Sequence, residues 1–228
     1  MRDTFAALER DVVACERCPR LRAWCQGVAK ERVKRFREET YWGRPVPGFG
    51  DKDASLWIVG LAPAAHGGNR TGRVFTGDRS GDFLFAALHR AHFASSPLST
   101  RRDDGLRLSD CYISPIVRCA PPDNKPSREE TALCRDYLGR EWELLPNLRA
   151  ILVLGHLALS GFLAMYKERH PKGPRRLPFG HGLRHDLGDG VSLFTSYHPS
   201  QQNTFTGRLT KESFDRLLRE VRAHLGRA

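Results

Sequence analysis

The chain has 228 residues, which is long enough for one domain whose hydrophobic core needs no disulfide staples. Its formal net charge of +11, with four tryptophans and twelve phenylalanines, points to a polyanionic partner, most simply a nucleic acid. No apolar run approaches membrane-spanning length, and the N-terminus lacks a secretory apolar stretch, so the composition excludes a membrane protein and predicts a cytoplasmic one.

The first predicted element is a helix over residues 3–14, with apolar residues at helical spacing. It leads into Cys15 and Cys18, a C-x-x-C pair whose two thiolates can converge on one metal. In a reducing compartment the six cysteines are expected to include metal or cluster ligands rather than disulfides.

A strongly basic run, residues 30–37, is followed by an aromatic, proline-rich loop over residues 41–50. The basic run has two interpretations, a solvated helix face or a face that contacts phosphates, and the sequence leaves both open.

Beyond residue 54, apolar strands alternate with helical patterns four times. The strands are expected at residues 55–59, 111–117, 150–155 and 191–197, and the helices at 82–93, 128–145, 156–166 and 211–225. This alternation predicts an α/β fold with a parallel sheet and helices on both faces, in one domain over residues 1–228. Residues 167–185, rich in glycine, proline and basic side chains, are expected to be a surface excursion.

The loop over residues 60–81 is the most informative stretch of the chain. It is rich in glycine, connects the first strand to a helix, and carries His66, Phe75 and Asp78. A loop between a strand and a helix N-terminus lies at the carboxyl edge of the sheet, where open α/β folds bind ligands. Its glycines match neither the phosphate loop nor the dinucleotide motif. The alternative is a surface loop built from ordinary turn residues.

Two later loops carry further candidates, Asn124 after the second strand and His198 after the fourth. Each candidate has a structural explanation of its own: Asp78 as a helix cap, Asn124 as a turn residue, His198 as a buried loop histidine. Because the carboxyl ends of parallel strands meet at one edge, the three loops are expected to form one site.

The cysteines form a second constellation, with four candidate ligands: Cys15, Cys18, Cys119 and Cys134. Cys25 and Cys111 are left over, and local sequence does not separate the two sets cleanly, although Cys111 begins a strand and is expected to point into the core. Four thiolates fit either a 4Fe–4S cluster or zinc.

Five motifs together resemble the family 5, or type B, branch of the uracil-DNA glycosylases. They are CxxCP (residues 15–19), YWGRPVPGFGD (41–51), GLAPAAHGGNRTGRVFTGD (60–78), VRCAPPDNKP (117–126) and SYHPSQQNTFTGRLT (196–210). The resemblance implies a three-layer α/β/α sandwich around a four-stranded parallel sheet, with the active site at the carboxyl ends of the strands. It also implies a 4Fe–4S cluster on Cys15, Cys18, Cys119 and Cys134.

By the same resemblance, Asp78, Asn124 and His198 fall on active-site positions and Phe75 on the residue that stacks on the flipped base. Most members of the wider superfamily carry a polar side chain early in the first motif to position water. At this position the chain has Pro63-Ala64-Ala65, so the role of positioning water shifts toward Asp78. The apolar segment could also admit hypoxanthine or other deaminated bases besides uracil.

The expected activity is hydrolysis of the N-glycosidic bond, which leaves an abasic site. His198 would bind a uracil carbonyl and stabilise the leaving anion, and Asp78 would orient water or stabilise the sugar cation. Asn124 and His66 would bind the base. In the last loop, Gln201, Gln202 and Phe205 are candidates for a wedge that fills the gap in the duplex, and Arg208 for a phosphate contact.

No lysine in the matched motifs is an evident Schiff-base nucleophile, so a monofunctional enzyme is expected. The enzyme is also expected to be a monomer. The competing hypotheses are an iron–sulfur DNA-binding module without hydrolytic activity and a phosphoesterase.

Overall fold

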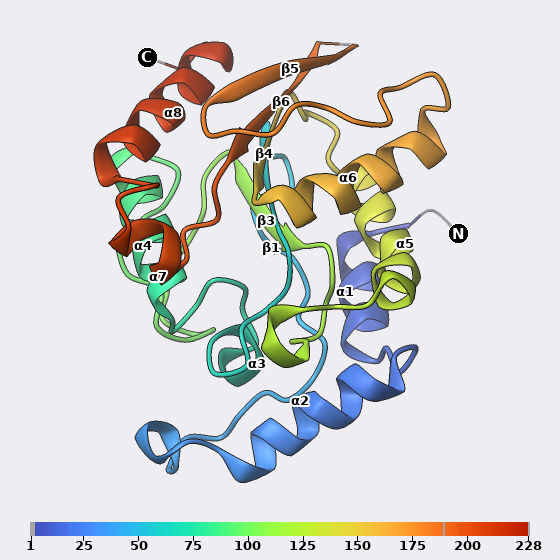
Figure 1. The fold of residues 1–228 in the computed structure, drawn as a ribbon, viewed down its shortest axis with the longest axis vertical. Coiled ribbons are helices and arrows are strands. Elements are labelled where there is room, and N and C mark those ends of the chain that lie inside the picture. The colour runs from blue at the N-terminus through green and yellow to red at the C-terminus, as the bar shows by residue number, and fades with distance from the viewer. Residues whose placement is uncertain (1–2, 189, 228) are drawn as a thin grey trace.

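The computed structural model describes residues 3–188 and 190–227, and these form a six-stranded sheet with helices on both sides (Figure 1). The strand order is β1-β3-β2-β4-β6-β5. The strands are β1 (Phe49–Gly50), β2 (Leu56–Gly60), β3 (Cys111–Pro115), β4 (Ala150–Leu154), β5 (Leu183–Gly188) and β6 (Val191–Ser196). The helices are α1 (Phe5–Val13), α2 (Pro19–Glu31), α3 (Gly68–Thr71), α4 (Arg79–Arg90), α5 (Arg128–Leu144), α6 (His156–Arg169), α7 (Gln201–Phe205) and α8 (Lys211–His224), with 3-10 turns η1 (Lys34–Phe36) and η2 (Pro122–Asn124).

The four inner strands, β3, β2, β4 and β6, pair in parallel, which confirms the predicted α/β fold. All residues of β2 and β4 are buried, as expected for strands covered by helices on both faces. The loops that follow these four strands therefore open at one edge of the sheet.

The expected number of four strands was wrong, because an antiparallel strand is added at each edge. β1 pairs with β3, and β5 pairs with β6. β5 begins in the last residues of the segment expected to be a surface excursion and continues beyond it; most of its residues are exposed, and only Leu187 is buried. An exposed edge strand shows no apolar run in the sequence, since backbone pairing with its neighbour places it. The helix α2 was likewise not predicted.

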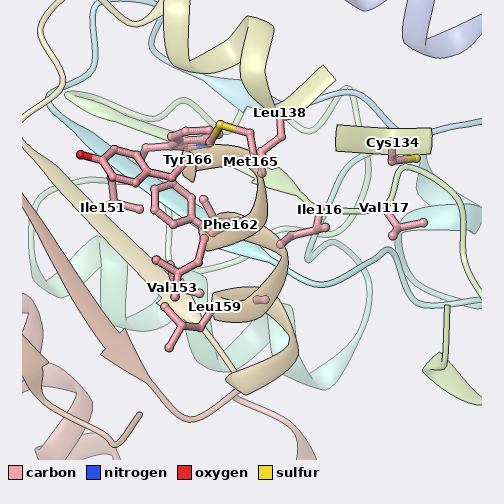
Figure 2. Close-up of a cluster of buried hydrophobic side chains, with 14 of the residues drawn as sticks. Ile116, Val117, Cys134, Leu138, Ile151, Val153, Leu159, Phe162, Met165 and Tyr166 are labelled. Atoms are coloured by element: carbon pink, nitrogen blue, oxygen red, sulfur yellow. The ribbon is translucent and has the colours of Figure 1, made fainter. Parts of the chain in front are cut away.

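The hydrophobic core lies in two layers on opposite faces of the sheet. Alternate residues of β2 point to opposite sides: Trp57 and Val59 pack toward α5 and α6, and Leu56 and Ile58 pack toward α4 and α8. Figure 2 shows the first layer, where Ile151 and Val153 of β4 lie near the α6 side chains. The sequence-predicted three-layer arrangement is thus confirmed. No described helix has the length and apolar character needed to cross a lipid bilayer.

Candidate active site

A cavity of about 610 Å³ opens where the four parallel strands end. It is lined by the loops that follow β2, β3, β4 and β6. The side chains and backbone that line it belong to Leu61, Ala62, Ala64, Phe75, Asp78, Ser80, Asn124, Leu154, Gly155, His156, Leu157, Ala158, Phe179, Tyr197, His198, Ser200, Gln202, Asn203 and Arg208. The structure therefore brings Asp78, Asn124, His198 and Phe75, which the sequence scatters over 124 positions, into one pocket.

Asp78 both caps a helix and lines the cavity. Its Oδ1 accepts a hydrogen bond from the Gly81 amide at 2.9 Å, so it is the N-cap of α4. Burial raises the pKa of Asp78, and the amides of Gly81 and Ser80 partly offset this effect. A Cβ at Gly67 would lie 2.1 Å from Asp78 Oδ2. Only glycine at position 67 therefore leaves room for this carboxylate, which explains one glycine of the long loop.

Phe75 and His198 face each other across the pocket, with ring centroids 5.8 Å apart and ring planes 31° apart. Phe75 has a φ of +50°, a backbone conformation that bulky residues rarely adopt and that tends to occur at functional sites. A Cβ at Gly60 would lie 2.8 Å from Phe75 Cζ, so the ring packs directly on the backbone at the end of β2. This contact fixes the aromatic face that the pocket presents.

His198 follows β6, and Asn203 Nδ2 donates a 2.8 Å hydrogen bond to its backbone carbonyl. Burial lowers the pKa of His198 to about 4. At neutral pH the imidazole is therefore uncharged, with one ring nitrogen that donates and one that accepts. A neutral donor in a buried pocket is suited to bind a carbonyl oxygen on which negative charge develops.

The low pKa of His198 predicts how stability depends on pH. The unfolded chain binds this proton with an ordinary pKa of about 6.5. The stability contributed by neutral His198 is therefore complete above about pH 6.5 and is lost as the pH falls toward the folded value of about 4, by at most ~1.4 kcal/mol per pH unit. We expect urea unfolding of the wild type to lose more stability over this window than unfolding of His198→Gln. Parallel pH dependence in the two proteins would contradict the prediction.

Asn124 lies in η2, where it and Asp123 have positive φ angles of 56° and 53°. Asparagine and aspartate tolerate this left-handed conformation better than most residues. The exposed side chain of Asn124 lines the cavity.

Three sequence-predicted residues do not line the cavity. His66 Nδ1 is 3.1 Å from the Tyr41 hydroxyl, so this side chain ties the aromatic loop to the first motif. Gln201 lies at the start of α7. Phe205, at the end of the same helix, is 71% exposed and lies 6.0 Å from the Arg79 guanidinium. Of the last loop, Gln202 and Arg208 line the cavity, and Arg208 lies over the Tyr197 ring.

The sequence reasoning missed the start of α6, where Gly155, His156, Leu157 and Ala158 line the cavity. The N-cap Gly155 has a φ of +102°, and no side chain caps the helix. The positive end of α6 therefore adjoins the pocket. A glycine directly after the apolar run of β4 was the signal available in the sequence.

The candidate ligand cysteines gather around α5. The Cys18 thiol interacts with the Cys134 thiol, Cys15 interacts with the Tyr137 hydroxyl one turn further along α5, and Cys119 interacts electrostatically with Cys134. Four cysteines lie in the core on this face of the sheet: Cys18, Cys25, Cys119 and Cys134.

Cys111 lies in the core, as expected from its place at the start of a strand, and it lies on the opposite face of the sheet, so the fold separates it from the set. Cys25 stays close to the set, because its thiol donates a 3.4 Å hydrogen bond to the carbonyl of Ala120, the residue after Cys119, and interacts with the Cys119 thiol. In the ranges that the structure describes, no group of three or more His, Cys, Asp or Glu side chains would hold a single metal ion.

The chain belongs to the uracil DNA glycosylase superfamily, because the model of that family matches residues 47–222. Within it, the chain is 49% identical to the type-5 uracil-DNA glycosylase of Mycobacterium tuberculosis over 216 residues, which cover 94% of this chain and 80% of that protein. It is 48% identical to the Thermus thermophilus protein of the same name over 220 residues, 96% of this chain and 98% of that one. The Pyrobaculum aerophilum protein is 43% identical over 215 residues, 94% and 91% of the two chains. These identities place the chain in the type-5 group.

Proposed function

We propose that this chain is a DNA repair glycosylase that removes uracil from DNA and leaves an abasic site. The observation that carries the proposal is the convergence of Asp78, Asn124, His198 and Phe75 in one cavity at the carboxyl ends of the strands. Family membership and the net charge of +11 support it. We also propose that the protein acts on DNA in the cytoplasm as a monomer.

The target base must first leave the duplex, at a cost of a few kcal/mol that is smallest for a mispaired base such as uracil opposite guanine. A cavity of about 610 Å³ is large enough to enclose a flipped nucleoside. Phe75, whose ring is fixed against β2, would stack on the base, and Asn124 would hydrogen-bond its edge. Binding of the base by His66 would require this side chain to release the Tyr41 hydroxyl, from which its Nδ1 is 3.1 Å away.

In the chemical step, the bond from the sugar carbon to the base nitrogen breaks and its electron pair leaves with the base. His198, held neutral, would donate its N–H to a uracil carbonyl and stabilise the departing anion. The positive end of α6 would act in the same direction. Water then supplies the hydroxyl that joins the sugar, and the remaining proton of that water neutralises the departed base.

Asp78 would face the positive charge that develops on the sugar, either by orienting the attacking water or by direct electrostatic stabilisation. Pro63 and Ala64 offer no side chain for this role. No lysine is among the residues that line the cavity in the described part of the chain, which supports a monofunctional enzyme. The apolar lining near Ala64 supports acceptance of hypoxanthine and other deaminated bases as well.

Release of free uracil from a duplex with one G·U pair tests the proposed function. We expect release by the purified wild type and an abasic strand that stays intact until alkali is added. DNA binding without base release would instead favour the non-catalytic iron–sulfur module. Release of phosphate without free base would favour a phosphoesterase.

The last loop is proposed to fill the gap left by the flipped base. Gln202 and Arg208 line the cavity, Phe205 is exposed one turn after Gln202 on α7, and Arg208 would contact phosphate. We expect the double substitution Gln201→Ala and Gln202→Ala to lower activity on duplex DNA several-fold more than activity on single strands. Gln26→Ala, an exposed glutamine on α2, is the matched control. An unchanged ratio of the two activities would refute the wedge.

We further propose that a 4Fe–4S cluster binds Cys15, Cys18, Cys119 and Cys134. The donor set is all thiol, three of the four are buried, and they gather on one side of the sheet. When bound, the cluster would supply a cross-link between the N-terminal segment, the loop after β3 and α5. Hydrolysis transfers no electron, so its role is structural.

Substitution of one ligand cysteine should therefore lower the stability of the fold, and activity should fall only as a consequence of that lower stability. We expect the wild type to contain about four iron atoms per chain. Cys119→Ser should lower both the iron content and the unfolding temperature, and Cys111→Ser, on the opposite face, should leave the iron content unchanged. A well-folded, active Cys119→Ser protein without iron would refute the structural role, and zinc in place of iron in the wild type would refute the cluster.

A further inference from the structure

Arg118 is a buried cation that is only partly bonded. Its side chain is 1% exposed, and its Nη2 donates a 2.6 Å hydrogen bond to Glu141 Oε2, which is itself fully buried. Among the described residues, its Nε and Nη1 have no hydrogen-bond acceptor. Buried polar groups in folded proteins are nearly always bonded, so these two N–H groups require an explanation.

The acidic partner is held firmly. Glu141 also accepts hydrogen bonds from the Ser114 hydroxyl at 2.7 Å and the Tyr112 hydroxyl at 3.3 Å. Trp57 Nε1 donates to Ser114 in turn, at 2.9 Å. This network fixes one edge of the Arg118 guanidinium and leaves the other two nitrogens free for a different partner.

The cysteine set lies next to Arg118. Arg118 directly precedes Cys119, its backbone lowers the pKa of the Cys134 thiol, and its guanidinium interacts electrostatically with the Cys134 sulfur. Figure 2 shows Cys134 on α5 near Val117, the residue before Arg118 in the same core layer. The free donors therefore belong to the surroundings of the proposed cluster ligands.

Other charged groups near the thiols already have partners. Arg22, which interacts with Cys25 and Cys119, bonds to Glu16 and to the Gly43 carbonyl. Arg17 is partly exposed and pairs with Asp136, and Arg20 pairs with Glu130. Of the arginines near the described cysteines, Arg118 is thus set apart by full burial and two unused N–H groups.

We infer that Arg118 is the counter-cation of the proposed cluster, to whose sulfur atoms its Nε–H and Nη1–H donate. The inference rests on the cluster proposed above. Four thiolates around an oxidised 4Fe–4S core carry a net negative charge, and a buried anion needs a nearby cation or hydrogen-bond donors. Arg118 supplies both, and Glu141 orients it.

The charge makes an electrochemical prediction. A reduced cluster carries one more negative charge, so a nearby cation favours reduction, and hydrogen bonds to the sulfurs act in the same direction. Removing the Arg118 charge should therefore lower the reduction potential of the cluster. Removing the Glu141 charge while Arg118 stays should raise it. Substitution of Arg118 and substitution of Glu141 are therefore expected to shift the reduction potential of the cluster in opposite directions. A general loss of structure would shift it in the same direction in both variants.

The experiment compares full-length wild type, Arg118→Gln and Glu141→Gln, each purified without oxygen. Iron content is measured first, then the cluster potential by protein-film voltammetry, then the rate of iron loss to a chelator. Arg73→Gln is the matched control, because Arg73 forms a comparable buried pair with Asp104 but bonds to Thr76 and Ser99 rather than to the cysteine set. We expect about tenfold faster iron loss in Arg118→Gln than in the wild type or the control.

Potentials shifted in opposite directions, with faster iron loss in Arg118→Gln, support the inference. If Arg118→Gln does not fold, the double variant Arg118→Gln/Glu141→Gln leaves no unpaired buried charge and should still lose iron faster. Unchanged potentials and iron loss at the wild-type rate would overturn the role of Arg118 alone. A wild type without iron would overturn the proposed cluster as well, and uracil release would remain a separate test.

Discussion

Asp78→Asn is expected to slow uracil release from a G·U duplex by about 10²–10⁴-fold, the range usual for loss of a positioned acid–base group. Asparagine caps helices as well as aspartate does, so the bond to the Gly81 amide and the start of α4 should be preserved. The loss would therefore report the carboxylate charge that faces the sugar, and not the folding of the loop.

The measurement is single-turnover release of free base with enzyme in excess, together with the unfolding temperature of each protein. Asp82→Asn is the matched control, because Asp82 lies in the first turn of the same helix but does not line the cavity. Activity in Asp78→Asn within a few-fold of the wild type would assign Asp78 to helix capping alone. Catalysis would then have to depend on the residues that contact the departing uracil, such as His198.

His198→Ala should lower the rate of base release by about 10²–10³-fold, as removal of one donor to a developing oxyanion usually does. His198→Gln keeps an N–H donor at the same position and should recover part of the loss. Because the folded pKa of His198 is about 4, the wild-type rate should not fall through titration of this group until the pH approaches that value.

The exposed histidine of α4 provides the control, as His89→Ala should leave the rate unchanged. Equal loss in His198→Ala and His198→Gln would argue against a hydrogen-bonding role. A wild-type rate that halves near pH 6.5 would show that the histidine titrates with its ordinary pKa in the working enzyme.

Several features of the fold are determined by local sequence alone. The apolar runs of β2, β3, β4 and β6 predict buried parallel strands, because a strand covered on both faces must be apolar throughout. The start of α5 is equally local: Ser127 and Glu130 form a capping box within four residues. The position of the cavity followed from these elements, since the loops after parallel strands share one edge.

Other elements depend on partners distant in sequence. The exposed strand β5 exists because β6 offers it backbone groups to pair with, and its own residues carry no signal. The partner of His66 is also distant in sequence. The first motif made His66 a candidate for substrate binding, but in the fold its side chain is bonded to Tyr41.

By itself, the sequence determined the α/β class, the parallel inner sheet and the four side chains that meet in the cavity. These follow from patterns within one strand, loop or helix end. Only the tertiary structure decided that Phe75 packs on Gly60, that Cys111 lies across the sheet from the other cysteines, and that Arg118 meets Glu141. Each of these depends on strand order and on which face a side chain occupies. Both are set by long-range packing, which no local pattern encodes.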